Sequence, residues 1–123
     1  MTKFRKALLA FSSLLATGPA AAQQYACSVN PTGYLGIGAD GTVAVTVNGD
    51  RVAQICNVSQ AIGGVSPEAC TAWYSSLLTW RTIGKTGVIF FDSTNPANAG
   101  NTACTQFSPT EWIIRIPYHI GAA

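Results

Sequence analysis

Residues 33–58 read GYLGIGADGTVAVTVNGDRVAQICNV, and this stretch decides the fold. Apolar residues alternate with smaller or polar ones around Asp40-Gly41, and a second glycine-containing segment, Asn48-Gly49-Asp50, separates residues 42–47 from residues 51–58. Such segments between alternating runs indicate β-hairpins, because glycine adopts the positive φ that a tight turn requires. The stretch therefore predicts three antiparallel strands in a meander, the first starting at Gly33.

One amphipathic helix is predicted after the meander. Ser66 and Pro67 form a typical N-cap and first-turn pair, and Gly84 marks the end of the helix. Apolar residues recur between them at helical spacing, at Cys70, Trp73, Tyr74, Leu77 and Leu78. We expect Trp73 and Tyr74 to pack against the sheet, because such a stripe usually faces the core.

Two further strands complete the predicted order. Residues 87–91 form a short buried strand, residues 92–110 a long loop that contains Cys104, and residues 112–120 the last strand. Pro117 restricts its part of the last strand to an edge, a bulge or a strand end. This order predicts a mainly β fold with one helix, a five-stranded OB-type barrel (β-β-β-α-β-β). An α+β sandwich with the helix on one sheet face is the alternative.

The N-terminal 22 residues have the pattern of a cleavable signal peptide. Lys3, Arg5 and Lys6 precede an apolar segment, and small residues follow it up to Ala22. The apolar segment is roughly a dozen residues long, whereas a membrane-spanning helix needs about 20. The sequence thus predicts export to the periplasm or the medium, a single domain at residues 23–123, and no membrane insertion after cleavage.

Removal of the signal peptide leaves a nearly neutral chain. Three of the seven Lys and Arg residues lie in residues 1–22 and all five Asp and Glu residues lie beyond them, so the formal net charge changes from +2 to 4 − 5 = −1. The remaining basic residues are scattered along the chain, at Arg51, Arg81, Lys85 and Arg115. Nucleic acid is therefore not an expected partner, because its binding requires grouped basic residues.

The predicted mature chain contains four cysteines: Cys27, Cys56, Cys70 and Cys104. An even number of cysteines in an exported protein indicates disulfide bonds, here two. Each could stabilise the domain by about 2 to 4 kcal/mol. Three pairings can be drawn, and the sequence does not choose among them.

The sequence contains no pattern that indicates catalysis, a cofactor or a metal site. Residues 36–41 match the dinucleotide fingerprint Gly-x-Gly-x-x-Gly, but a predicted strand follows them where that motif needs a helix. His119 is the only histidine, too few for a metal cluster, and a disulfide-bonded Cys104 cannot be a nucleophile beside it. Asp92 and Glu111 flank the long loop without a spacing that identifies a glycosidase pair. We expect a protein that is not an enzyme.

Part of the chain resembles a known group of proteins. The segment Ile55-Cys56-Asn57-Val58-Ser59, residues 64–78, Gly84-Lys85 and residues 88–91 together resemble small exported proteins of Gram-negative bacteria. This strand, cysteine, helix, glycine and strand layout is also similar to the binding (B) subunits of subtilase cytotoxin and pertussis-like toxins. The resemblance implies an OB-type barrel, a homo-oligomeric ring of five subunits, and recognition of cell-surface glycans. The serine-bearing segment that helps to hold the sugar in those subunits has no counterpart between Gln23 and Gly33, so no sugar-contact residue is carried over.

The main functional prediction is a binding domain for a cell-surface glycan. Aromatic faces stack on the C–H surfaces of sugars, and amides and carboxylates bond to their hydroxyl groups. The candidate binding residues are Tyr34, Asp92, Asn95, Asn98, Asn101 and Tyr118. Asparagine is also common in loops for structural reasons, because its side chain bonds to nearby backbone. The alternative is a protein-interaction module, such as an inhibitor or a structural subunit, that pairs with another protein through residues 112–120 as an edge strand.

Overall fold

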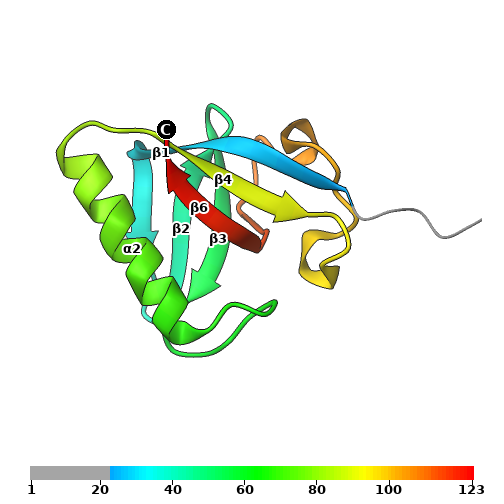
Figure 1. Cartoon of the computed structure of the whole chain (residues 1–123), viewed down its shortest axis with the longest axis horizontal. Coiled ribbons are helices and arrows are strands. Elements are labelled where there is room, and N and C mark those ends of the chain that lie inside the picture. The colour runs from blue at the N-terminus through cyan, green and yellow to red at the C-terminus, as the bar shows by residue number, and fades with distance from the viewer. Residues whose placement is uncertain (1–22) are drawn as a thin grey trace, which may run out of the picture.

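The computed structural model describes residues 23–123, so the predicted signal peptide at residues 1–22 lies outside the described residues. The described chain is mainly β with one α-helix, as predicted (Figure 1). Its strands are β1 (Gln24–Ile37), β2 (Thr42–Val47), β3 (Arg51–Asn57), β4 (Gly87–Asp92), β5 (Ile113–Ile114) and β6 (Pro117–Ala122). Helix α2 (Pro67–Thr82) lies between β3 and β4 in the chain, and two short 3₁₀ turns, η1 (Pro96–Asn98) and η2 (Cys104–Gln106), follow β4.

The predicted meander is confirmed. β2 pairs antiparallel with β1 on one side and with β3 on the other. Gly41 has φ +92° in the first turn, and Asn48 and Gly49 have φ +48° and +87° in the second. Val43, Val45 and Val47 are fully buried, so alternate residues of β2 point into the core as the pattern predicts.

The first strand is longer than predicted, because it begins at Gln24 rather than at Gly33. Its first half pairs with β4, and its second half pairs with β2. The register shifts between Asn30 and Leu35, a segment that includes the predicted start at Gly33. An irregularity of this kind bends a strand without ending it. β1 therefore belongs to both halves of the sheet.

The last predicted strand is divided into two short ones. β5 pairs parallel with β3, and β6 pairs antiparallel with β4. Arg115 and Ile116 join them, and Pro117, which has no N–H, begins β6, so it lies at a strand end as predicted. The sheet order β5-β3-β2-β1-β4-β6 therefore has six strands rather than five, and the mixed sheet is not closed by hydrogen bonds. The two ends of this order are consecutive segments of the chain.

Helix α2 begins as predicted. The Ser66 side chain caps it by accepting a hydrogen bond from the Ala69 N–H at 3.1 Å. Trp73 and Tyr74 pack partly buried against the core, as expected. Leu78 is 42 % exposed, so the core-facing stripe is narrower than the spacing predicts. Figure 1 shows α2 along one side of the molecule, with β4 and β6 crossing in front of β2 and β3 as the sheet curves.

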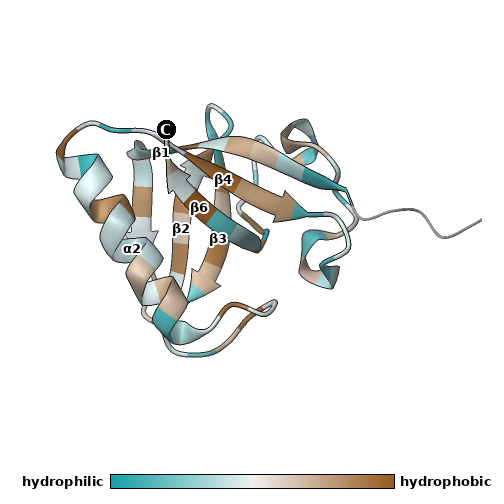
Figure 2. Cartoon of the chain, in the orientation of Figure 1, coloured by the Kyte–Doolittle hydropathy of each residue, from teal (hydrophilic) through white to brown (hydrophobic). Residues whose placement is uncertain are grey.

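Two disulfides, as predicted, fasten the periphery to the sheet. Cys27 of β1 bonds to Cys104 of η2, and Cys56 of β3 bonds to Cys70 in the first turn of α2. Buried apolar residues of the strands and of α2 form one core cluster. Figure 2 shows that hydrophobic positions recur along these elements. The largest buried side chains of the cluster include Ile55, Leu77, Ile89, Phe91 and Phe107. Within residues 23–123, no helix has the length and apolar character needed to cross a membrane.

Candidate functional site

The predicted binding residues are distributed over three places. Tyr34 lines a cleft on the outer face of β1, β2 and β3. Asn95 and Tyr118 line a depression near the start of α2. The remaining three lie at the end of β4 (Asp92) and in the loop after it (Asn98 and Asn101), and they bond within this loop or to the segment between β5 and β6. Only the first two places therefore offer a surface to a ligand.

Asn98 and Asn101 connect the loop to the segment between β5 and β6. Asn98 is fully buried; its Nδ2 donates to the carbonyl oxygens of Asp92 and Ile116 at 3.0 Å each, and its Oδ1 accepts from the Ile116 N–H at 2.6 Å. Asn101 Oδ1 accepts from Arg115 Nε at 2.6 Å. Asn98 thus bonds to backbone groups and Asn101 to the Arg115 side chain, both structural uses of asparagine in loops, and we do not include them in the site.

Asp92 and Asn95 organise the turns at the start of the loop. Asp92 Oδ1 accepts from the hydroxyl of Thr94 at 2.6 Å and from its N–H at 2.8 Å, and these bonds to the ionised form lower the pKa of the Asp92 carboxyl. Asn95 caps η1, accepting from the Ala97 N–H at 3.0 Å and donating to the Gly63 carbonyl oxygen at 3.0 Å. Both side chains thus have local partners.

The depression near the start of α2 is mainly an aromatic surface. Tyr118, which is 47 % exposed, and Trp73 line a space of about 290 Å³ with Asn95 between the turn at Gly63 and β6. None of the described residues that line it has a charged side chain. Because the Asn95 amide is already bonded through both its nitrogen and its oxygen, the depression offers few groups that could orient a polar ligand.

Residues that pair across three neighbouring strands form the floor of the cleft on the outer face of the sheet. Gly36 of β1 pairs with Ala44 of β2, and Ala44 pairs with Gln54 of β3, so the three residues form one row across the sheet. Ala44 is only 5 % exposed although it does not belong to the core cluster. Its neighbours Val43 and Val45 point into the core, so Ala44 points to the outer face. The walls of the cleft therefore bury it.

Two exposed aromatic rings form one wall of this cleft. Tyr34 and Trp112 lie with their ring centroids 4.7 Å apart and an interplanar angle of 52°, and they are 38 % and 53 % exposed. Gly36 makes room for this arrangement, since a Cβ there would collide with the Tyr34 hydroxyl. The sequence predicted Tyr34 but not Trp112, because the two residues meet only through the non-local pairing of β3 with β5.

The opposite wall is the β1–β2 turn, which presents a carboxylate. Asp40 Oδ1 accepts from the Thr42 N–H and Oδ2 accepts from the Thr42 hydroxyl, each at 3.0 Å. These bonds, the backbone one first, lower the pKa of the Asp40 carboxyl, so it stays ionised at neutral pH. A carboxylate has about four acceptor positions, which leaves acceptor capacity for a ligand. Within residues 23–123, the Gln54 side-chain amide at the floor makes no hydrogen bond.

No protein-family model, curated protein or solved structure matches this chain. The cleft is therefore interpreted from its own geometry, and the similarity to toxin B subunits stays a prediction. Among the described residues, no group of three or more His, Cys, Asp and Glu side chains could hold a metal ion.

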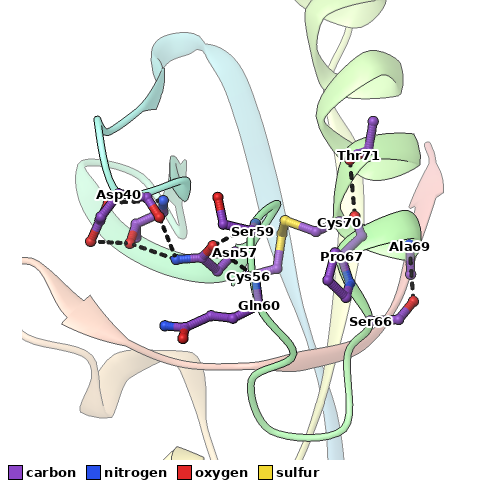
Figure 3. The surroundings of a disulfide bond; sticks show 11 residues. Asp40, Cys56, Asn57, Ser59, Gln60, Ser66, Pro67, Ala69, Cys70 and Thr71 are labelled. Atoms are coloured by element: carbon purple, nitrogen blue, oxygen red, sulfur yellow. Dashed lines mark hydrogen bonds between the residues drawn. A yellow bond between two sulfur atoms is a disulfide. The ribbon is translucent and has the colours of Figure 1, made fainter.

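A buried asparagine fixes the position of the carboxylate wall. Asn57, 1 % exposed, donates from Nδ2 to the Asp40 carbonyl oxygen at 3.1 Å, and its Oδ1 accepts from the Ser59 N–H at 2.7 Å (Figure 3). Cys56 beside it is bonded to Cys70, so the turn is connected through β3 to the first turn of α2. Asn57 was not predicted as a site residue, although an Asn at the end of the strand that follows an Asp-Gly hairpin was an available signal.

Proposed function

We propose that this protein is an exported, non-catalytic binding domain of OB type, and that its cleft binds a glycan. The observation that carries the proposal is the Tyr34–Trp112 pair, which stands exposed beside an ionised carboxylate and an amide. Exposed apolar surface that lies together at a hollow with polar groups beside it is typical of ligand-binding sites. Rings of this kind stack on the C–H face of a sugar while the polar groups bond to its hydroxyls.

The strand pairing supports the OB-type barrel. β1 pairs with both β2 and β4, and β3 pairs in parallel with β5. Arg115 continues the β5 ladder by donating from its N–H to the Gln54 carbonyl oxygen at 3.1 Å, directly before the chain crosses to β4 as β6. In OB folds, ligands bind to the face of strands 2 and 3 and to the loops after strands 1 and 4. The cleft lies at the same place, between the β1–β2 turn and Trp112.

The chemistry of the cleft supports binding rather than hydrolysis. In the part of the chain that the structure describes, Asp40 is the only carboxylate that lines it, whereas glycosidases use two that flank the scissile bond. The space of about 230 Å³ is smaller than a typical drug-sized site, which spans about 300 to 1,000 Å³. We infer that it accepts a single terminal sugar ring.

Two features support export. The N-terminal residues carry the predicted signal peptide, and the described domain has two disulfides, which persist in oxidising compartments such as the periplasm. Expression of the full chain in a Gram-negative host tests this directly: the protein purified from the periplasm or the medium is expected to begin at Gln23. A product that still carries Met1 contradicts the cleavage.

A glycan array probed with the exported protein tests the proposed binding. The wild-type protein is expected to bind a defined set of glycans, and Trp112→Ala to weaken that binding by about two- to tenfold, because an aromatic contact contributes roughly 0.5 to 1.5 kcal/mol. Ile83→Ala is the matched control, since Ile83 is 65 % exposed at the end of α2, away from the cleft. A folded wild-type protein that binds no glycan contradicts the proposal.

The alternative, a protein-interaction module, is favoured by one observation. β6 lies at an end of the sheet and pairs only with β4 among the described strands, so one of its backbone edges is available for strand addition. Recovery of a stoichiometric protein partner together with an empty glycan array would select this function. The five-membered ring implied by the toxin resemblance is tested by native mass spectrometry, where a monomer at micromolar concentration contradicts it.

A further inference from the structure

The charge of the cleft is set by one residue. Of the described residues that line it, Asp40 is the only one with a charged side chain, and its two oxygens are held in place by Thr42 at 3.0 Å. The other polar groups at the cleft, the Gln54 amide and the hydroxyls of Tyr34 and Thr42, are neutral. A ligand in this cleft therefore meets a single fixed negative charge.

Among residues 23–123, no basic side chain lines the cleft to balance this charge. The three arginines of the described chain are bonded to other parts of the molecule: Arg51 Nε donates to the Phe107 carbonyl oxygen at 2.9 Å, Arg81 Nη1 to the Pro31 carbonyl oxygen at 2.6 Å, and Arg115 Nε to Asn101 Oδ1 at 2.6 Å. Arg115 also lies over the Phe107 ring, 5.9 Å from its centroid. A carboxylated ligand would have no cation to pair with.

We infer, on the basis of the proposed glycan binding, that the cleft selects neutral sugars and rejects those with a carboxylate, such as sialic and uronic acids. A second carboxylate in the cleft would be repelled by Asp40 and would lose water without gaining a partner. Repulsion of this kind is an effective source of specificity, because it penalises the wrong ligand without weakening the right one.

Neutral sugars have complementary groups for the same atoms. Their hydroxyls can donate to the acceptor capacity that Asp40 retains, and the Gln54 amide can both donate to and accept from a hydroxyl. The carbon face of the ring can lie on Tyr34 or Trp112. The same carboxylate that repels an acidic sugar thus contributes a charge-assisted hydrogen bond to a neutral one.

The experiment compares neutral glycans with their carboxylated counterparts on one array: hexosides beside the matching hexuronides, and lactosides beside sialyl-lactosides. The exported wild-type protein is expected to bind neutral members at least about tenfold more strongly than acidic ones, since a like-charge contact near a protein surface costs enough for that ratio. Asp40→Asn is expected to reduce the ratio to about twofold. The Asn side chain keeps the oxygen that accepts from the Thr42 N–H, so the turn is preserved.

Asp50→Asn is the matched control, because it removes the same charge from the exposed turn at the other end of β2. It is expected to leave the ratio unchanged. Raising the ionic strength should lower the wild-type ratio by screening and leave that of Asp40→Asn almost constant. Equal or preferred binding of acidic glycans, unaffected by Asp40→Asn, overturns this inference while the glycan-binding proposal stands. Binding of neither class by the folded protein overturns both.

Discussion

Two regions of this protein are rich in polar side chains, and they use them in opposite ways. In the loop after β4, Asn95 and Asn98 direct their amides to backbone groups, and Asn98 has no exposed surface. In the cleft, Asp40 and Gln54 keep hydrogen-bonding capacity, and the Tyr34–Trp112 rings beside them are exposed. The comparison teaches that composition does not identify a binding surface. A candidate binding surface is identified by where each polar group points and by how much hydrogen-bonding capacity it retains.

The largest expected effects concern the disulfides that fasten the two regions. The Cys27–Cys104 bond anchors the loop and joins residues 77 positions apart, and its loss should lower the free energy of unfolding by about 4 kcal/mol. The Cys56–Cys70 bond joins residues 14 positions apart, and its loss should lower the free energy of unfolding by about 3 kcal/mol. Each Cys pair is replaced by Ser, and stability is measured by chemical denaturation. A larger loss from the shorter separation would show that local packing, rather than chain constraint, dominates.

Asn98→Ala should separate stability from binding. The substitution leaves the N–H and C=O of Ile116 and the C=O of Asp92 without their side-chain partner, and unpaired buried groups of this kind cost about 1 to 3 kcal/mol. We expect the free energy of unfolding to fall by about 2 kcal/mol and glycan affinity to stay within twofold, by array or titration. Affinity that falls in step with stability would place the loop in the site after all.

Asn57→Ala is the matching substitution beside the cleft. It should also destabilise, by about 1 to 2 kcal/mol, since it removes bonds to the Asp40 carbonyl and the Ser59 N–H. Unlike Asn98→Ala, it should also weaken glycan binding by about tenfold, because the turn that carries the Asp40 carboxylate loses its anchor. Unchanged affinity in this variant would show that the turn holds its position without Asn57.

The smallest expected effect is on acid stability. The pKa of Asp40 and that of Asp92 are both lowered by hydrogen bonds from the residue two positions on, Thr42 and Thr94. A lowered native pKa means that the ionised form stabilises the fold: the contribution is complete above the ordinary pKa of about 3.9 and is lost as the pH falls through the lower native values.

Thermal unfolding between pH 6 and pH 2 measures this contribution. Asp40→Asn and Asp92→Asn should each flatten the acid side of the profile, while Asp50→Asn should not. Because both carboxyls are exposed, the differences should be small. Identical profiles for all four proteins would show that these bonds have no effect on stability.

The local elements of the fold were predictable from periodicity and turn chemistry. β2, β3, α2 and β4 were all located within a residue or two, because their signals lie within the element itself. The first half of β1 also carries a signal, since Tyr25, Cys27 and Val29 alternate with more exposed neighbours. Pro31 and Gly33 obscured it, because a bulge and a strand boundary have the same composition.

The non-local features could not be predicted in this way. The disulfide pairing, the division of the last strand and the meeting of Tyr34 with Trp112 all depend on how distant segments pair. Asp40 was assigned to its turn, which is correct, but the binding role that we propose for it depends on the walls that face it. Local patterns thus located one cleft residue, Tyr34, whereas the cleft itself required the tertiary structure.

β5 and β6 come last in the chain, after β3 and β4, the strands with which they pair. They are the two outermost strands of the sheet. The order in which the domain folds is therefore constrained. The β1–β2–β3 meander and the Cys56–Cys70 bond can form from neighbouring residues, whereas Cys27–Cys104 and the two outer ladders must wait until distant segments meet. Such late, long-range steps are slow. Until those segments meet, the strand edges of β3 and β4 that pair with β5 and β6 lack their partners.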